Sequence, residues 1–446
     1  MLRRTGIGAG VLACALVMAG CTGGGEPTRE PTASPTLAPP PTITFGTYGS
    51  KAELVAMEQV VADFNASSPS GQVELETWDN HDQAIREVLD GSGPDVFMSS
   101  RSDVGRLADS DLVRPISLLL DERGVDYGDR YSRDALDAFA HNDELQCMAY
   151  SISPMVIYYN TELVDFEAMQ AAGLDVPGGT RDRWSLDEFA QAAEFASRGR
   201  GAKGVWIEPT LAGLTPFITS GGGQLYDPQD LTTLTFSDQD TLAALDRTLA
   251  VLRDPLITPS ARAVERVSAL DRFKSGRLGM IAGYRDLVPE LRRTRGLSFD
   301  VIAMPVLDEV HTVGDIHGLC ISSKTKSVNT AADFIAYAVS DEALETVTDS
   351  GYIVPANTQV AASDLFLEPT KQPAQARVFT GAIRGMVVPP FIEDRVALNA
   401  AVTPLLRTML TGPGVLDLEA VAAQIDEASR SVLDPDYEPT EPTPSR

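Results

Sequence analysis

The stretch that most constrains the fold is residues 146–164, with the sequence QCMAYSISPMVIYYNTELV. It predicts a β-strand, a polar break at Ser151–Ser153 and a second strand over Val156–Tyr159. Pro154 has no backbone N–H and fits poorly inside a central strand. A helix-start pattern follows at Asn160–Glu162. We therefore expect the chain to cross here from one packed lobe to another, with a ligand cleft at the crossing.

Length and composition limit the classes of protein to consider. The chain has 446 residues, more than one hydrophobic core usually organises, so we expect two domains. Its hydrophobic content of 43% excludes a globally disordered chain. The formal net charge is −27 and no patch of Lys and Arg stands out, so we expect no nucleic-acid partner. The acidity otherwise favours solubility and says nothing about the fold.

Residues 1–20 have the pattern of an export signal, with a basic start and an apolar run over residues 6–18 that is too short to span a bilayer comfortably. Residues 17–21, VMAGC, resemble the lipobox of a bacterial lipoprotein signal, with Met18 at the position where Leu is most common. The resemblance implies cleavage before Cys21 and a diacylglycerol on its sulfur. An ordinary secretory peptide, an uncleaved anchor and twin-arginine export are the alternatives.

A tether is predicted directly after Cys21. Residues 22–41 contain six prolines and three glycines and almost nothing apolar, so they are expected to be extended and to pack no core. No later apolar run reaches ~18 residues, so we expect no transmembrane helix. These features predict a protein on the outer face of the cell membrane that contacts the membrane only through its lipid. Residues 433–446 are expected to be a disordered tail.

Strands and helices alternate from Thr42 onward. Strands are predicted over 42–45, 73–77 and 95–98, with helices over 51–65 and 82–89 between them. This order indicates an α/β lobe with a mainly parallel sheet. Beyond residue 164 the spacing of apolar residues predicts further helices and strands. The helices are 185–193 (with Ser185 and Glu188 as a capping box), 211–220, 238–252, 263–275 and 331–340, and the strands are 205–207, 278–282, 299–304 and 318–322.

Six short stretches have a specific order and spacing along the chain. They are Pro94–Phe97 (PDVF), Met155–Val164 (MVIYYNTELV), Trp184–Ala193, Phe273–Tyr284 (FKSGRLGMIAGY), Ala332–Leu344 and Gly351–Pro355 (GYIVP). Together they resemble the extracellular solute-binding proteins of ABC importers, in the maltose-binding-protein-like group called family 1. The resemblance covers nearly the whole chain.

The resemblance implies an α/β, two-lobe periplasmic-binding-protein-like fold of type II, with hinge strands and a ligand cleft. Mapped onto this chain, residues 42–150 plus 308–345 would form the first lobe, and residues 151–307 plus 346–432 the second. On this map Cys147 and Cys320 lie on first-lobe strands near the hinge, which favours a disulfide in an oxidising compartment. Two buried free thiols are the alternative.

Ligands of such folds lie at strand ends and helix N-termini that face the cleft. Sugars need aromatic faces for stacking and polar side chains that bond hydroxyl groups. We therefore predict ligand contacts just beyond the predicted strands, although each residue could instead be an ordinary core or surface position. The predicted contacts are Tyr48, Trp78, Asp79, Ser100, Arg101, Tyr150, Trp206, Ser220, Gly221, Gly222, Tyr284, Arg285, Asp315 and His317.

Neither a metal site nor catalytic machinery is indicated. The four histidines are scattered and no CxxC pair occurs, so we expect no metal and no cofactor. The sequence contains no GxSxG, HExxH or P-loop motif, and the glycine-rich turn at residues 220–223 lacks the Lys of a phosphate loop. We therefore expect no enzymatic activity.

The resemblance implies a monomeric substrate-binding protein that captures a solute, here a sugar or oligosaccharide, and delivers it to an ABC permease. A cell-surface enzyme that acts on polysaccharide is one alternative. A lobe pair that senses a ligand for a membrane receptor is another. Arg101 or Arg285 in the cleft would favour an anionic solute instead, because guanidinium binds carboxylate or phosphate in a bidentate way.

Overall fold

The computed structural model describes residues 40–437 except 132, 200 and 228. Residues from Pro40 onward form one compact unit. The predicted signal peptide, Cys21, nearly all of the tether and most of the C-terminal tail lie outside the described residues. None of the described helices is long and apolar enough to cross a membrane.

The larger sheet of the described residues is built from strands that are far apart in the sequence. These are β1 (Thr42–Thr47), β2 (Gln72–Thr77), β3 (Val96–Ser100), β4 (Val113–Arg114), β7 (Cys147–Pro154), β14 (Thr312–Ser322), β15 (Val354–Pro355) and β16 (Met386–Val387). The order is β15–β7–β14–β3–β1–β2, with β4 and β16 paired to β14. The β1, β2 and β3 unit is parallel as expected, whereas β14 runs antiparallel to β3 and β7.

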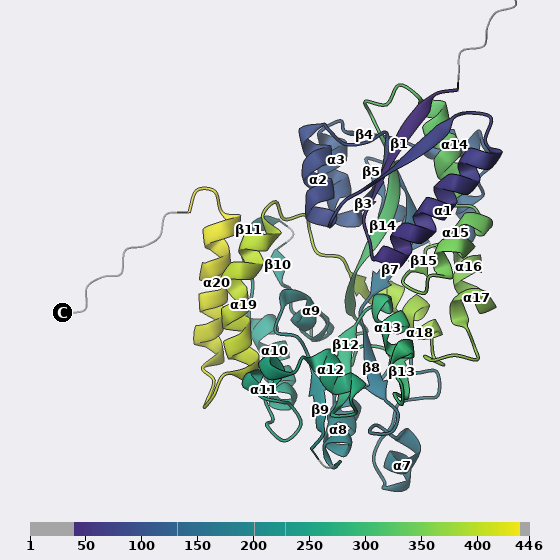
Figure 1. Cartoon of the computed structure of the whole chain (residues 1–446). Coiled ribbons are helices and arrows are strands. Elements are labelled where there is room, and N and C mark those ends of the chain that lie inside the picture. Colours follow the sequence, from purple (N-terminus) through teal and green to yellow (C-terminus); the bar gives the residue numbers. More distant parts are fainter. Residues whose placement is uncertain (1–39, 132, 200, 228, 438–446) are drawn as a thin grey trace, which may run out of the picture. The chain divides into compact units, whose positions relative to one another are not determined.

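Helices cover both faces of this sheet, and together with it they form what we call the first lobe. In Figure 1, α1 (Lys51–Ser67), α14 (Val328–Ala338) and α15 (Asp341–Thr348) lie on one side, and α2 (His81–Asp90) and α3 (Val104–Asp109) on the other. Right-handed crossovers require this, because the chain steps from β1 outward to β2 and then back past β1 to β3. The remaining short elements are α4 (Ser117–Asp121), α5 (Tyr127–Arg130), α6 (Arg133–Asp137), β5 (Ala140–His141), β6 (Glu144–Leu145) and α16 (Thr358–Ala362).

The first helix shows how the sequence positions these elements. Ser50 caps α1, since its hydroxyl accepts a hydrogen bond from the Glu53 backbone N–H and the Glu53 carboxylate accepts one from Ser50 N–H. Met57, Val60 and Phe64 recur at helical spacing on the buried side of α1. The helix predicted over 51–65 is thus confirmed, and it packs its apolar face into the core of the first lobe.

A smaller sheet, with the helices around it, forms the second lobe. Its strands are β8 (Val156–Asn160), β9 (Lys203–Trp206), β12 (Leu278–Gly283) and β13 (Phe299–Ile302), in the order β13–β8–β12–β9. Successive side chains of β8 lie in two different hydrophobic clusters of the second lobe. Ile157 packs in one cluster and Tyr158 in the other. Both faces of β8 are therefore buried, which explains its unbroken apolar sequence.

The second lobe contains most of the remaining elements. They are α7 (Phe166–Ala171), α8 (Leu186–Ser197), α9 (Leu211–Ser220), β10 (Tyr226–Asp227), β11 (Asp230–Leu234), α10 (Gln239–Leu252), α11 (Ala261–Arg266), α12 (Ala269–Lys274), α13 (Val288–Arg293), α17 (Asp364–Leu367), α18 (Arg377–Gly381), α19 (Arg395–Thr411) and α20 (Leu418–Leu433). Three 3₁₀ turns, Arg101–Asp103, Arg285–Leu287 and Ala382–Gly385, complete the described elements. The predicted capping box of Ser185 and Glu188 is present at the start of α8.

The lobes are connected where β7 passes into β8. The predicted break at Ser151–Ser153 is wrong, because these residues stay within β7, paired with β14. The break falls at Met155, one residue after Pro154. Met155 N–H donates to Val313 O at 2.8 Å, and its carbonyl accepts from Thr312 Oγ1 at 2.6 Å. The chain therefore passes between the lobes along two adjacent segments, one at Met155 and one at Thr312–Val313.

Two further predictions of local structure are corrected. The strand predicted over 318–322 begins at Thr312, because pairing with β7 outweighs the weak strand propensity of Gly314 and Asp315. A Cβ atom on Gly314 would lie 2.4 Å from Ser153 O, so the strands approach closely there. The helix predicted over 263–275 is divided into α11 and α12, since Val267 is extended and Ser268 caps a new helix.

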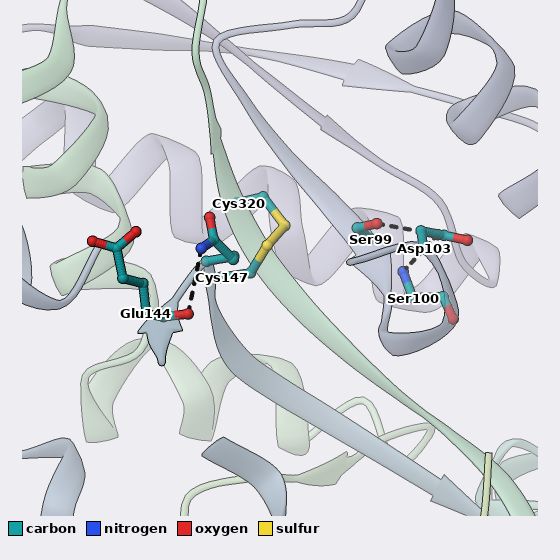
Figure 2. The surroundings of a disulfide bond; sticks show 7 residues. Ser99, Ser100, Asp103, Glu144, Cys147 and Cys320 are labelled. Atoms are coloured by element: carbon teal, nitrogen blue, oxygen red, sulfur yellow. Dashed lines mark hydrogen bonds between the residues drawn. A yellow bond between two sulfur atoms is a disulfide. The ribbon is translucent and has the colours of Figure 1, made fainter. Parts of the chain in front are cut away.

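The described structure joins Cys147 and Cys320 in a disulfide. Figure 2 shows the bond between β7 and β14, where the two residues are opposite each other in the ladder. Both residues are completely buried in the first lobe. The free-thiol alternative left open by the sequence is therefore not the arrangement seen here.

The predicted residue boundaries of the lobes stay predictions. Within residues 346–432, Val347 and Val360 pack in the core of the first lobe, whereas Leu398 and Val402 pack in the second. The chain therefore passes between the lobes again after β14. The last passage is the segment from residue 388 to residue 394, which leads from β16 to α19.

Candidate functional site

A cavity of about 810 Å³ lies where the elements of both lobes meet. The first lobe contributes one face of α2 along its length, the end of β3 with the turn after it, and the first half of β14. The second lobe contributes residues of α9, β10 and α19, together with Tyr284. The segment 388–394 completes the wall. A cavity of this size is in the range of small-molecule sites.

A buried carboxylate organises the first-lobe side of the cavity. β3 ends at Ser100, and the turn that follows places Asp103 back over the strand end in a capping arrangement. Asp103 is only 1% exposed, and its Oδ2 accepts hydrogen bonds from Ser99 Oγ at 3.1 Å and Ser100 N–H at 3.2 Å. Figure 2 shows both bonds. The same Oδ2 lies 2.8 Å from His81 Nε2, so Asp103 also fixes the ring at the start of α2.

Asp315 and His317 face the cavity from alternate positions of β14. The Oδ1 atom of Asp315 accepts from Ser100 Oγ at 2.9 Å and from Ile316 N–H at 2.7 Å. Its Oδ2 lies 3.5 Å from His317 Nε2. One carboxylate oxygen is therefore held by the first lobe, while the other retains capacity for a solute donor.

Tyr48 lies between the two histidines of the cavity. Its ring centroid is 5.8 Å from that of His81 and 5.8 Å from that of His317, with edge-to-face geometry in both pairs. Its hydroxyl is buried and has no hydrogen-bond partner among the described residues. Burial raises the pKa of Tyr48 well above its ordinary value, and the charges of Asp315 and Asp103 raise it further. The phenol is therefore a neutral donor.

Arg395, the first residue of α19, meets α2 across the cavity. Asp394 caps this helix by accepting from Ala397 N–H. The Nη2 atom of Arg395 lies 2.7 Å from Asp82 Oδ1 and 3.1 Å from His81 Nδ1. Burial raises the pKa of Asp82, but the charge and hydrogen bond of Arg395 outweigh this and lower it. An ion pair thus joins the two lobes at the cavity wall.

The second-lobe side of the cavity is mainly apolar and aromatic. Tyr226 and Tyr284 both line it, and burial raises the pKa of each to about 12. Phe391 faces the first lobe, with Arg106 Cζ 5.7 Å from its ring centroid. The cavity therefore combines carboxylates, hydroxyls and imidazoles on one side with aromatic rings on the other, which suits an uncharged polyhydroxylated solute.

Residues 59–374 match the family of bacterial extracellular solute-binding proteins. The chain belongs to this family. The match covers most of the chain and includes β7, β8 and β14, which connect the lobes, whereas β1, β16, α19 and α20 lie outside it. It also agrees with the expectation drawn from the sequence motifs.

Solved structures confirm the fold of this solute-binding protein. It is similar to an ABC substrate-binding protein from Listeria monocytogenes in complex with cycloalternan (TM-score 0.70, 18% identity, 87% of this chain and 98% of that chain). It is also similar to a cyclic α-maltosyl-1,6-maltose binding protein from Arthrobacter globiformis (0.68, 15%, 88% and 99%). A third is the maltotriose binding protein of Thermus thermophilus with maltotriose (0.64, 15%, 87% and 99%). The likeness establishes the two-lobe, type II binding-protein fold.

Four of the predicted contact residues line the cavity of the solute-binding protein: Ser100, Tyr284, Asp315 and His317. Tyr48 packs against two lining histidines. These five come from four separate stretches of sequence and are brought together by the ends of β1, β3 and β12 and by β14. Whether they bind a solute stays a prediction.

Three predicted aromatic contacts lie in packed cores and do not line the cavity. Trp78 lies against Gly46, and its Nε1 donates to Glu87 Oε2 at 2.7 Å. Tyr150 is 1% exposed, with its hydroxyl 3.7 Å from Met57 Sδ. Trp206 is buried in the second lobe beside β12. A position at a strand end therefore does not show whether a side chain faces the cavity or the core.

Arg285 is also buried away from the cavity, directly after Tyr284. Its Nε donates to Gly351 O at 3.1 Å and its Nη2 to Phe366 O at 3.3 Å. Burial lowers its pKa to about 10. Its guanidinium lies over the Phe366 ring, 4.6 Å from the centroid. It holds the chain on both sides of β15 against the second lobe, so the reason for expecting an anionic solute from this residue is removed.

The other predicted contacts are placed elsewhere. Ser220 is buried, donates to Glu309 O at 2.5 Å and accepts from Leu307 N–H at 2.8 Å. Gly221 packs against α10, and Gly222 lines a separate, smaller cavity of about 520 Å³. Asp79 and Arg101 are exposed, and neither lines the cavity between the lobes. Whether they contact a solute stays a prediction.

Several residues of the site were missed by the sequence analysis: His81, Asp82, Asp103, Tyr226, Phe391 and Arg395. Asp103 carried a usable signal, because a serine at a strand end followed three residues later by Asp predicts a capping arrangement. Arg395 carried no such signal, because its contact with Asp82 in α2 joins residues that are 313 positions apart in the sequence. Among the described residues, no group of three or more His, Cys, Asp or Glu side chains could hold a metal ion.

Proposed function

We propose that this solute-binding protein captures a sugar or oligosaccharide in the cavity between its lobes and delivers it to the permease of an ABC importer. The observation that carries the proposal is the cavity itself. It has the carboxylate of Asp315 and the imidazole of His317 on one side and the rings of Tyr226 and Tyr284 on the other. Sugar hydroxyls require the polar groups, and the apolar faces of sugar rings pack on the aromatic ones.

Two further points support this choice of solute. The chain belongs to a family of extracellular solute-binding proteins. Proteins of similar fold have been solved with cycloalternan and maltotriose, at 18% and 15% identity to this chain. The charged groups nearest Tyr48 are paired with one another, Asp82 with Arg395 and Asp103 with His81, which favours an uncharged solute at this part of the cavity.

We further propose that Ser100, Asp315, His317 and Tyr284 contact the solute, with Tyr48 packed against the ring of His317. The lipid on Cys21 would hold the protein at the outer face of the membrane, and residues 22–41 would give it reach. Labelling with a radioactive fatty acid in a bacterial host tests the anchor. The wild type should incorporate label and Cys21→Ser should not.

A thermal-shift screen of sugars, polyols, amino acids, phosphates and metal salts tests the solute class. A solute at about 100 times its Kd stabilises the folded protein by about 2.7 kcal/mol, which shifts the unfolding midpoint visibly. Hits confined to sugars would support the proposal. Hits confined to anions or amino acids would contradict it.

Chromatography of each hit after long incubation separates binding from turnover. The proposal predicts that the sugar is recovered unchanged. Cleavage products that disappear in Asp315→Asn would instead support the alternative of a cell-surface enzyme that acts on polysaccharide, because glycoside hydrolysis needs carboxylates at the scissile bond.

Transport and sensing make different predictions in the cell. If the protein feeds a permease, a strain that lacks it should lose uptake of the radiolabelled solute. If it serves a membrane receptor, uptake should persist while the response to the solute is lost.

A further inference from the structure

The cavity wall contains a contact between the lobes that does not depend on solute. Its first-lobe half, His81 and Asp82, lies in the first turn of α2, whose Ala84 and Val88 pack in the core of the first lobe. Its second-lobe half is Arg395, in the first turn of α19, whose Leu398 and Val402 pack in the core of the second lobe. A movement of one lobe relative to the other must therefore break it.

We propose that Arg395, Asp82 and His81 form a latch that holds the lobes together, and that protonation of His81 weakens it. The latch acts on closure of the lobes in the absence of solute. Arg395 Nη2 lies 2.7 Å from Asp82 Oδ1 and 3.1 Å from His81 Nδ1. One guanidinium nitrogen of the second lobe is thus shared by two acceptors of the first.

The His81 ring is fixed from the other side. Its Nε2 lies 2.8 Å from Oδ2 of Asp103, which is also held by Ser99 and Ser100. A neutral ring that donates its Nε2 proton to Asp103 presents an unprotonated Nδ1 to Arg395, and Nδ1 can then accept. The Asp103 carboxylate acts as a positioning residue, because it selects the tautomer that the latch requires.

Protonation changes this geometry. The imidazolium carries a proton on both nitrogens, so Nδ1–H would face the N–H of Arg395 and two positive charges would lie 3.1 Å apart. The ion pair of Arg395 with Asp82 would remain, but it is partly exposed, with the two side chains 48% and 31% accessible. Exposed ion pairs contribute little alone. Acid should therefore favour separation of the lobes.

The charged groups around His81 act on its pKa in the way that this mechanism requires. Asp82 on the same helix, Asp103 in the turn after β3, and Asp315 on β14 are acidic groups of the first lobe, and Tyr48 packs on the ring. Burial lowers the pKa of His81, the bond and charge of Asp103 raise it, and the net pKa is above its ordinary value. Arg395 lowers it, and Arg395 is the only group of the second lobe among these influences.

Other charged residues line the same cavity and complete the surroundings. They are Arg86, Asp90, Arg106, Glu393, Asp394 and His317. Of these, Asp394 is occupied in capping α19. When the lobes separate, His81 loses Arg395 and gains solvent, and both changes raise its pKa. By linkage, the more basic open form is favoured as the pH falls.

Spin-label distances across the cavity test the latch in solute-free protein. In the full chain, with Cys14 and Cys21 replaced by serine in every sample, nitroxides are attached at Leu118→Cys and Leu256→Cys. Both leucines are highly exposed, one in each lobe, and the disulfide leaves no other free thiol. Distances are measured from about pH 8.5 to about pH 5.5, the range in which a histidine near this pKa titrates.

The wild type should show a longer distance population that grows as the pH falls. A difference of one unit between the His81 pKa of the open and closed forms would change the closing equilibrium about tenfold. His81→Gln, which does not titrate, should lose the pH dependence, and Arg395→Gln should favour the longer distance at every pH. The matched control is His141→Gln, since His141 bonds Asp109 at 2.9 Å outside the cavity and should behave as the wild type.

Histidine NMR titration gives a second readout that a purely structural role would not move. Arg395→Gln should raise the pKa of His81, whereas Arg407→Gln, which removes an exposed ion pair at the far end of α19, should not. Distances that do not depend on pH in the wild type would overturn the proposal. So would a pH response that persists in His81→Gln, or a His81 pKa that is the same in Arg395→Gln. A failure of the sugar screen would leave these results unaffected.

Discussion

Asp103 Oδ2 lies 2.8 Å from His81 Nε2, and this contact ties the turn after β3 to the first turn of α2. Both residues line the cavity, yet Asp103 is almost completely buried. Its carboxylate is shared among the ring, Ser99 and Ser100, so it determines the shape of the first-lobe side of the site. The same carboxylate therefore affects stability, the solute site and the latch.

Replacement of Asp103 by alanine should destabilise the protein. The change leaves the Ser100 N–H and Ser99 hydroxyl without their buried acceptor, and we expect the free energy of unfolding to fall by about 2 to 3 kcal/mol. Urea unfolding followed by circular dichroism measures it. Asp109→Ala is the matched control, because its side chain is 70% exposed and should cost about 0.5 kcal/mol or less. Equal losses in the two variants would contradict the role given to Asp103.

The disulfide should stabilise the first lobe. It joins residues separated by 173 positions, so it removes much conformational freedom from the unfolded chain. Replacement of both Cys147 and Cys320 by alanine should lower the free energy of unfolding by about 2 to 5 kcal/mol. Chemical unfolding of the oxidised wild type and the double variant measures the difference. An unchanged unfolding midpoint would show that the bond does not form or does not contribute.

Asp315 should matter for solute affinity more than for folding. Its Oδ2 is not held by a backbone or hydroxyl donor among the described residues, so Asp315→Asn removes charge that a solute hydroxyl would meet. We expect the Kd of a sugar found in the screen to rise roughly tenfold to a hundredfold, as for the loss of a charged hydrogen bond. Calorimetric titration measures it, with circular dichroism as the check on folding.

Trp206→Phe is the matching test of a predicted contact that the structure buries. Its indole Nε1 is buried and has no partner among the described residues, so phenylalanine removes an unpaired donor while keeping an aromatic ring in the core. The affinity for the same sugar should be unchanged within about twofold. A loss as large as that of Asp315→Asn would mean that the ring reaches the solute.

The pH dependence of stability should differ between the wild type and His81→Gln. The pKa of His81 is raised in the folded protein, so its contribution to stability is fully present below the unfolded value of about 6.5 and is lost as the pH rises through the folded pKa. The wild type should therefore lose stability relative to His81→Gln over that interval. Urea midpoints at matched pH values measure the difference, and parallel profiles would refute it.

The overall fold could be predicted because its signals are local and repeated. The alternation from β1 to β3 follows from apolar spacing, and the capping box at Ser185 marks a helix start within four residues. The strand β14 was only half predicted. Its first residues contain Gly314 and Asp315, which have low strand propensity, and only the pairing with β7 makes them a strand.

The site could be predicted only in part, because a strand end does not reveal which face its side chains take. Tyr284 follows β12 and lines the cavity, whereas Arg285 beside it turns into the core and donates to the carbonyls of Gly351 and Phe366. The role of Arg395 could not be predicted from the sequence, for a different reason. Its partners, His81 and Asp82, belong to the opposite lobe, and no local pattern encodes a contact made by lobe placement.

A calorimetric titration of the wild type and Asp315→Asn, with the sugar that gives the largest thermal shift, shows whether the cavity between the lobes is the solute site. We expect saturable binding of one solute per chain in the wild type and a Kd raised at least about tenfold in the variant. Equal affinities would place the solute outside the cavity between the lobes. An absence of binding by any sugar, with the protein folded, would contradict the proposed solute class.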